Sequence, residues 1–193
     1  IYFFFKRNKF TFKKILLLIF TTLAINSFWL LPNLYYIKNA GFVPSQSKQN
    51  RLYSQEFNLR NKKNGVLPDV ALIKGFYFDW SIYDFQKLKT TNLMEEWNIY
   101  FNRSNALLVG YGLFIFAGLG IILSLIKKKV VFISLLPFFI IPFIFLMNNT
   151  FPFSGLYDFL MKYPILNESL RFVFTKFSIL LTFSYVIYFS LVV

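Results

Sequence analysis

The acids that could do chemistry in this chain are few, and they lie in two places. Glu95 and Glu96 are adjacent, and Asp79 and Asp84 lie five residues apart in an aromatic segment. Adjacent residues on a helix point about 100° apart, so the glutamates fit a solvated helix face better than a metal clamp. Asp79 and Asp84 could bind a cation only with ligands from elsewhere. We therefore predict no metal site and assign no catalytic residue.

The residue types that are missing narrow the chemistry further. The chain has no histidine and no cysteine, which excludes disulfides and thiolate metal sites and removes the usual general base. The sequence also lacks a phosphate-binding glycine loop, a dinucleotide fingerprint and a nucleophile elbow. Any catalysis would rest on carboxylates, lysine, tyrosine or a carboxylate-bound cation, and we expect no cofactor.

The most informative polar residues lie in the segment 164–177, PILNESLRFVFTKF. Arg171 and Lys176 stand at the start of an apolar run, and Glu168 lies three residues before Arg171. Two cations among phenylalanines at the mouth of a membrane span suit a phosphate headgroup whose tail lies in lipid. Alternatively, both cations only anchor the helix at the interface, with Glu168 pairing Arg171. The pattern leaves both alternatives open, and Arg171 and Lys176 are the candidate lipid-phosphate contacts.

The composition indicates that hydrophobic helices position these residues. The chain is 56% hydrophobic and 22% aromatic, and its formal net charge is +13. The apolar residues form long uncharged blocks, and the basic clusters lie beside these blocks. That arrangement fits cytoplasmic flanks and anionic lipid headgroups, so we expect membrane lipid as a partner and no nucleic acid. The composition does not indicate an oligomeric state.

Four apolar blocks predict an all-α integral membrane fold with about four transmembrane helices. The clearest block is Ile15–Pro32, eighteen residues without a charge, which is long enough for a membrane-spanning helix. Pro137 and Pro142 are expected to kink the third span. Gly112 and Gly120 predict a close packing seam on the second. The predicted spans are 15–37, 106–126, 130–147 and 173–193.

The lysine clusters orient these spans by the positive-inside rule. The basic flank 1–14 and the turn 127–129 are expected in the cytoplasm, and the segments 38–105 and 148–172 outside. The predicted location is the cell membrane, as a multi-pass protein with residue 1 on the cytoplasmic side. Because IYFFF precedes Lys6 and the last span is cut short, we expect a piece of a longer polytopic protein, with a truncated last helix.

The two outer segments carry weaker patterns. Within the large loop, Phe42–Asn64 is poor in apolar residues and predicts an extended or mobile loop, and alternation around Phe76–Ile82 predicts a half-buried strand. Asn92–Asn102 predicts a short amphipathic helix on the membrane surface, begun by Asn92. In the smaller loop we expect a helix over Ser154–Tyr163, followed by one that starts at Asn167 and continues through Lys176 into the last span.

Two of these segments carry a resemblance to a known family. Asn26–Pro32, NSFWLLP, resembles the N-x-(F/Y)-W-L-L-P span end of the GT-C glycosyltransferase superfamily, and the segment 164–177 is similar to a P-x-L-x-x-x-x-R-x-x-x-x-K-F stretch of the same group, which includes the YfhO-type membrane proteins. The resemblance implies transfer of a sugar from a polyprenyl-phosphate donor to an outer-surface glycan or lipid. It also implies a catalytic carboxylate in an earlier outer loop, so no catalytic residue is carried over. Arg171 and Lys176 match the motif as possible contacts to the lipid phosphate.

Three functions remain open from the sequence. The first is an enzyme piece of the glycosyltransferase type, with a polyprenyl-phosphate-linked sugar as partner. The second is a transporter or flippase for lipid-linked glycans, which would need polar residues facing a cavity inside the spans. The third is a non-catalytic membrane scaffold that binds a partner through 38–105. The scarcity of polar residues in the spans, where Asn26 is the strongest, favours the enzyme.

Overall fold

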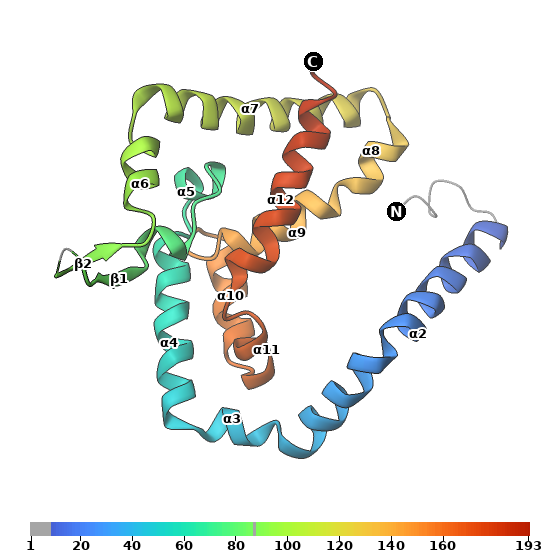
Figure 1. Cartoon of the computed structure of the whole chain (residues 1–193). Coiled ribbons are helices and arrows are strands. Elements are labelled where there is room, and N and C mark those ends of the chain that lie inside the picture. Colours follow the sequence, from blue (N-terminus) through green and yellow to red (C-terminus); the bar gives the residue numbers. More distant parts are fainter. Residues whose placement is uncertain (1–8, 87) are drawn as a thin grey trace. The chain divides into compact units, whose positions relative to one another are not determined.

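A computed structural model of the chain describes residues 9–86 and 88–193 (Figure 1). The chain divides into two units, Ile1–Tyr53 and Ser54–Val193. Most described residues lie in helices, and the exception to the helical pattern is one two-stranded hairpin. Residues 1–8 of the basic flank 1–14, which include Lys6 and the preceding IYFFF, lie outside the described residues.

The first unit is dominated by the long helix α2, Lys9–Ala40, which extends beyond the predicted span 15–37 at both ends. Its polar side chains are satisfied within the helix. Asn26 Nδ2 donates to the carbonyl of Thr22 at 2.7 Å, and Trp29 Nε1 donates to Asn26 Oδ1 at 2.8 Å. Asn26 therefore has partners in its own helix and does not depend on a neighbouring one.

Helix α2 exposes apolar side chains all round its surface. Phe20, Phe28 and Tyr35 are each more than two thirds exposed. A helix that is hydrophobic on every side belongs in a membrane or in a large core. Two described helical stretches are long and apolar enough to cross a membrane, and these are Phe12–Ala40 and Ser104–Ile126.

The prediction of a loop over Phe42–Asn64 is wrong, because this stretch is helical. It forms α3, Phe42–Gln46, and α4, Lys48–Lys63. The second unit begins within α4, and there Ser54, Phe57 and Asn61 are buried at helical spacing. The loop prediction failed because two of these three buried residues are polar, so the helix shows little hydrophobic periodicity.

The rest of the large predicted loop is ordered into short elements. The predicted half-buried strand is confirmed only as a strand that begins at Ser81, and its predicted burial is wrong. Phe76–Asp79 forms a 3₁₀ turn in which Phe76 and Phe78 are buried, and the strand that follows it is largely exposed. Asn92 ends the second strand and does not begin α6, where Met94 holds the N-cap position. The elements are α5 (Leu67–Ala71), η1 (Phe76–Asp79), β1 (Ser81–Asp84), β2 (Lys89–Asn92) and α6 (Glu95–Phe101), with Ser81 opposite Asn92 and Asp84 opposite Lys89 in the antiparallel hairpin.

The apolar helices of the second unit follow the predicted second to fourth blocks. Helix α7, Ser104–Ile126, matches the second block closely. The third block is divided at Pro137, as the kink prediction expects, into α8, Val130–Leu135, and α9, Pro137–Leu146, and Pro142 lies inside α9. Helix α12, Val173–Phe189, corresponds to the fourth block, and α8 with α9 and α12 form shorter apolar stretches than α7.

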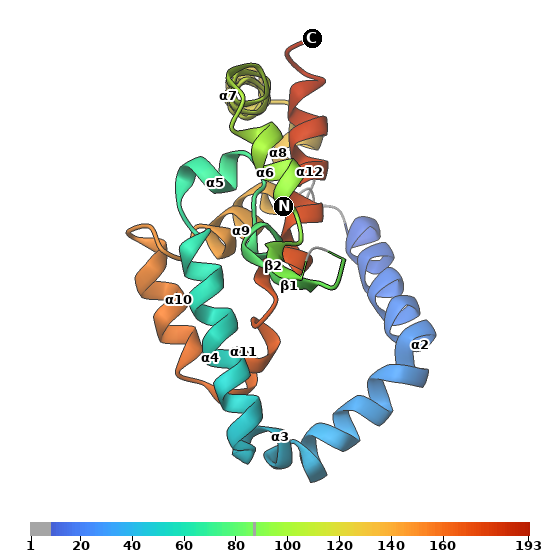
Figure 2. The same cartoon turned by 60° about the vertical axis from the view of Figure 1, so that its left-hand side comes forward.

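The core of the second unit lies where α12 packs against α7 and α9. Leu181 and Tyr188 on α12 are completely buried, as is Ala117 on α7. At Gly120 the backbones come so close that a Cβ would lie 1.9 Å from the carbonyl oxygen of Tyr188, whereas a Cβ at Gly112 would meet nothing within 4 Å. The seam therefore forms at Gly120 and not at Gly112, and α12 crosses α7 there (Figures 1 and 2).

Two short helices precede α12. The predicted helix over Ser154–Tyr163 is confirmed as α10, Phe153–Met161. The predicted continuous helix from Asn167 through Lys176 is wrong, because α11, Pro164–Ser169, ends before the chain turns into α12. Asn167 lies inside α11, and its amide donates to the carbonyl of Met161, so it does not cap a helix.

Candidate functional site before the last helix

Four polar side chains, which we call the polar layer, join α4 to α10 and α11 next to the two predicted phosphate contacts. They are Asn58, Asn61, Tyr157 and Asn167. Tyr157 donates its hydroxyl to Asn58 Oδ1 at 3.2 Å, and it accepts from Asn61 Nδ2 at 3.4 Å. Asn58 Nδ2 in turn donates to Asn167 Oδ1 at 3.1 Å. Because Tyr157 and Asn61 are buried, these hydrogen bonds fix the three helices against one another.

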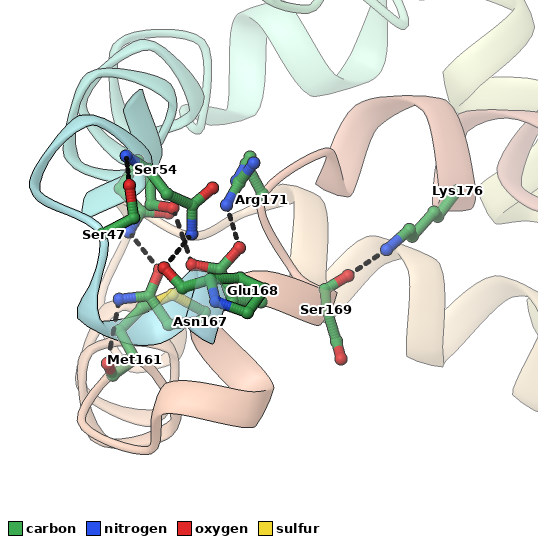
Figure 3. Close-up of polar contacts among 11 residues, drawn as sticks. Ser47, Ser54, Met161, Asn167, Glu168, Ser169, Arg171 and Lys176 are labelled. Atoms are coloured by element: carbon green, nitrogen blue, oxygen red, sulfur yellow. Dashed lines mark hydrogen bonds and ion pairs between the residues drawn. The ribbon is translucent and has the colours of Figure 1, made fainter. Parts of the chain in front are cut away.

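Arg171 is held at the edge of this layer. Its guanidinium forms an ion pair with Glu168, as their i, i+3 spacing predicts (Figure 3). Glu168 also accepts a hydrogen bond from Ser54 Oγ at 3.0 Å, and the carbonyl of Arg171 accepts one from Asn61 Nδ2 at 2.8 Å. The Arg171 side chain is only 13% exposed. Arg171 is thus engaged in holding the turn between α11 and α12.

Lys176 occupies a different position from Arg171. It lies in the first turn of α12, where its side chain is exposed, and its ammonium donates to the backbone carbonyl of Ser169 (Figure 3). The structure therefore brings Arg171 to Glu168 but gives Lys176 a separate, neutral acceptor. A neutral carbonyl leaves the positive charge of Lys176 available to an incoming anion.

Aromatic side chains pack against the turn between α11 and α12 and hold it in place. The ring of Phe172 packs on Phe57 with a centroid separation of 4.6 Å, and it lies 6.0 Å from Phe76. Gly75 admits the ring of Phe174, since a Cβ at Gly75 would lie 2.1 Å from that ring. Phe172 and Phe174, which both follow Arg171, are thus anchored against α4 and against the segment Gly75–Phe76, and this sets where α12 begins.

Burial changes the acid–base behaviour of the polar layer. The pKa of Tyr157 is raised from 10.0 to about 12, chiefly by burial, which disfavours the phenolate. The hydrogen bond from Asn61 opposes this shift, and the neighbouring Asp158 adds to it. Tyr157 is therefore a neutral hydrogen-bonding group at physiological pH and not a base.

Two of the four acids singled out by the sequence, Asp79 and Asp84, serve local structure. Asp79 accepts hydrogen bonds from Lys63 Nζ at 2.8 Å and Asn64 Nδ2 at 2.9 Å. Burial alone would raise the pKa of Asp79, but these bonds and the charges of Lys63 and Arg60 outweigh it, and the pKa is lowered. Asp84 accepts from the backbone amide of Gln86. Among residues 9–86 and 88–193, no group of three or more acids could hold a metal ion.

A small pocket beside the polar layer is too small for a sugar. Its volume is about 10 Å³, and its lining includes Asn61, Asn148 and Phe174. A space of this size holds about one water molecule.

Sequence reasoning missed the contribution of α4 to this site. Ser54, Asn58 and Asn61 repeat at intervals of four and three residues, which places them on one helix face. That spacing was the available signal, but a polar stripe in a lysine-rich segment is also typical of a solvated loop. The stripe becomes informative only beside Phe57, which is buried on the same face.

Comparison of the chain with models of protein families, with curated proteins and with solved structures finds no match. A function for the chain therefore rests on its residues and their geometry. At the start of α12 that geometry offers an exposed ammonium, on Lys176, and a guanidinium on Arg171 that is already paired with a carboxylate. The arrangement suits binding of a phosphate at the start of an apolar helix.

Proposed function

We propose that this chain is part of a polytopic membrane glycosyltransferase that moves a sugar from a polyprenyl-phosphate donor to an outer-surface glycan or lipid. The observation that supports this proposal is the position of Lys176, an exposed ammonium in the first turn of the apolar helix α12. A lysine there can reach a phosphate at the level of the headgroups while the lipid tail lies along the helix.

In this proposal the two cations have different roles. Lys176 contacts the donor phosphate, because the carbonyl that it contacts is a weak competitor for a doubly charged group. Arg171 is a positioning residue, because its side chain is mostly buried against Glu168. Its loss would move the turn that presents Lys176, so it acts on the phosphate through the backbone.

The proposed topology has four spans, with the polar layer on the outer side of the membrane. Helix α7 and the apolar part of α2 have the length and composition of spans. Helix α12 has 17 residues, which is at the lower end of the length needed to cross hydrocarbon, about 17–25 residues. Lys127–Lys129 between α7 and α8 would then lie in the cytoplasm, following the positive-inside rule.

A transporter or flippase for lipid-linked glycans is the alternative, and the side chains of the apolar helices favour it less. Such a protein needs polar groups that face a cavity inside the membrane. Here the serine and threonine hydroxyls of the apolar helices that have a described partner bond to their own helices, and the Tyr188 hydroxyl of α12 donates to the carbonyl of Phe132 in α8. Ser124 Oγ donates to the carbonyl of Ile121 at 2.7 Å and Thr182 Oγ1 to that of Ser178 at 2.9 Å.

Phosphate binding can be measured directly on the full chain in maltoside micelles. Polyprenyl monophosphate and the uncharged polyprenol are titrated separately, and binding is followed by native mass spectrometry. We expect Lys176→Gln to weaken binding of the monophosphate about twofold to fivefold, the effect of one exposed charged contact, and to leave polyprenol binding unchanged. Lys162→Gln is the matched control, since Lys162 is an exposed lysine on the same outer segment. Equal binding of the monophosphate by the two variants would show that Lys176 does not contact the phosphate.

Sugar transfer is the second measurement and requires the full-length protein. Membranes that contain it are assayed for transfer from polyprenyl-phosphate sugars. We expect Lys176→Gln to raise the apparent KM for the donor and Lys162→Gln to leave it unchanged. Transfer that continues at the wild-type rate in the Arg171→Gln, Lys176→Gln double variant would contradict the proposed function.

A further inference from the structure

An open hollow of about 440 Å³ lies on the outward face of α6, away from the polar layer. Glu96, Trp97 and Tyr100 line it. All three side chains are exposed, and the two aromatic rings are each about half accessible to solvent. Large exposed aromatic side chains beside a carboxylate are typical of a binding surface.

The two rings form perpendicular walls. Their centroids are 6.1 Å apart and their planes make an angle of 83°. The ring of Phe101 also packs near that of Trp97, with their centroids 6.2 Å apart. The opposite face of α6 is fixed, because Asn98 Nδ2 donates to the carbonyl of Phe78 at 2.9 Å. The hollow is therefore presented by a helix that is anchored on its other side.

The chemistry of these walls selects a cation. Aromatic faces carry negative electrostatic potential and attract ammonium groups, and quaternary ammonium groups are recognised in this way. The carboxylate of Glu96 adds a full negative charge at the same place. An anion would be repelled by Glu96, and a neutral sugar would gain from the rings but not from the charge.

The position of α6 in the chain indicates which kind of molecule carries the ammonium group. Helix α6 ends at Phe101, and α7, which is long and apolar enough to cross a membrane, begins at Ser104 (Figures 1 and 2). A connection of two residues holds α6 close to the end of that span, at the level where tryptophan and tyrosine gather in membrane proteins. The ammonium groups present at this level are those of lipid headgroups.

We propose that Glu96, Trp97 and Tyr100 bind the ammonium headgroup of a zwitterionic phospholipid, either choline or ethanolamine. The headgroup enters the open corner formed by the two rings, and Glu96 contacts its positive charge. This site is distinct from the proposed phosphate contact at Lys176 and does not depend on sugar transfer. Its role is to hold a bound lipid beside the start of α7.

The test uses the full chain in maltoside micelles, because that detergent carries no charge. Tryptophan is replaced by 5-fluorotryptophan, and the resonance of Trp97 is assigned by its loss in Trp97→Phe. Three soluble headgroup probes are titrated, namely glycerophosphocholine, glycerophosphoethanolamine and glycerophosphoglycerol. Glu95→Gln is the matched control for Glu96→Gln, since Glu95 is an exposed neighbour that does not line the hollow.

We expect the two ammonium probes to shift the Trp97 resonance saturably and glycerophosphoglycerol to leave it in place. Glu96→Gln should weaken the binding of the ammonium probes about fivefold, the effect of one exposed charge, and Glu95→Gln should change it less than twofold. The proposal is overturned by equal shifts from all three probes, by no saturable shift, or by equal effects of the two glutamate substitutions.

Discussion

The packing of α7 on α12 makes a sharp prediction for two glycines of the same helix. Gly120→Ala places a methyl group 1.9 Å from the carbonyl oxygen of Tyr188 and 2.6 Å from its carbon, whereas Gly112→Ala places one in open space. The obstructing atoms belong to the backbone and cannot rotate away. The two helices must therefore separate by about 1.5 Å to restore an ordinary contact near 3.4 Å.

The separation of α7 from α12 determines how much stability Gly120→Ala loses. It loosens the contacts of Ala117 and Leu181, both completely buried at the crossing. Overpacking of this kind costs ~1–3 kcal/mol, and the rigid backbone places Gly120→Ala at the upper end of that range. Both variants gain the same intrinsic helix propensity, up to ~1 kcal/mol, so the difference between them isolates the clash. We expect Gly120→Ala to be less stable than Gly112→Ala by ~2–3 kcal/mol.

The free energy of unfolding is measured in mixed micelles, where sodium dodecyl sulfate is titrated and helix content is followed by circular dichroism. Gly112→Ala controls for the change in helix propensity. If the two variants unfold at the same detergent fraction, the close approach of the two helices at Gly120 is refuted.

Two further predictions concern the second unit. Tyr157→Phe should lower its stability by ~1 kcal/mol, because the hydrogen bonds to Asn58 and Asn61 are lost. Since the pKa of Tyr157 is raised from 10.0 to about 12, its stabilising effect is complete below pH 10 and is lost between pH 10 and 12. The stability gap between wild type and Tyr157→Phe should therefore close over that window, and a gap that persists above pH 12 would contradict this role. Asp79→Asn should destabilise the protein above pH 3.8, because a lowered pKa stabilises the fold only while the carboxyl is ionised. That gap should shrink as the pH falls through the lowered pKa, and a gap that widens in acid would show that Lys63 does not hold the carboxylate.

Sequence pattern predicted the long apolar helices well and the polar helix poorly. The block around Ile15–Pro32 and the block of α7 are identified as helices by their length and lack of charge. Helix α4 was predicted as a loop, because two of its three buried residues, Ser54 and Asn61, are polar. Their burial depends on partners about a hundred residues away in sequence, which periodicity cannot reveal.

At the candidate site, too, the sequence predicted one contact and missed another. The pairing of Arg171 with Glu168 follows from their spacing on a helical turn and was one of two alternatives open from the sequence. The contact of Lys176 with the carbonyl of Ser169 depends on the turn between α11 and α12, which was predicted as continuous helix. The distinction between a buried guanidinium and an exposed ammonium therefore comes from tertiary structure.

The central proposal is that α7 crosses a membrane with the β1–β2 hairpin outside and the lysine turn inside. The chain contains no cysteine, so a single introduced thiol can be labelled alone. Gln86 and Lys127 are both exposed and lie on opposite sides of α7 in the sequence. A membrane-impermeant maleimide should label Gln86→Cys in intact cells and Lys127→Cys only after permeabilisation. Labelling of both positions in intact cells, or the reverse order, would contradict the account.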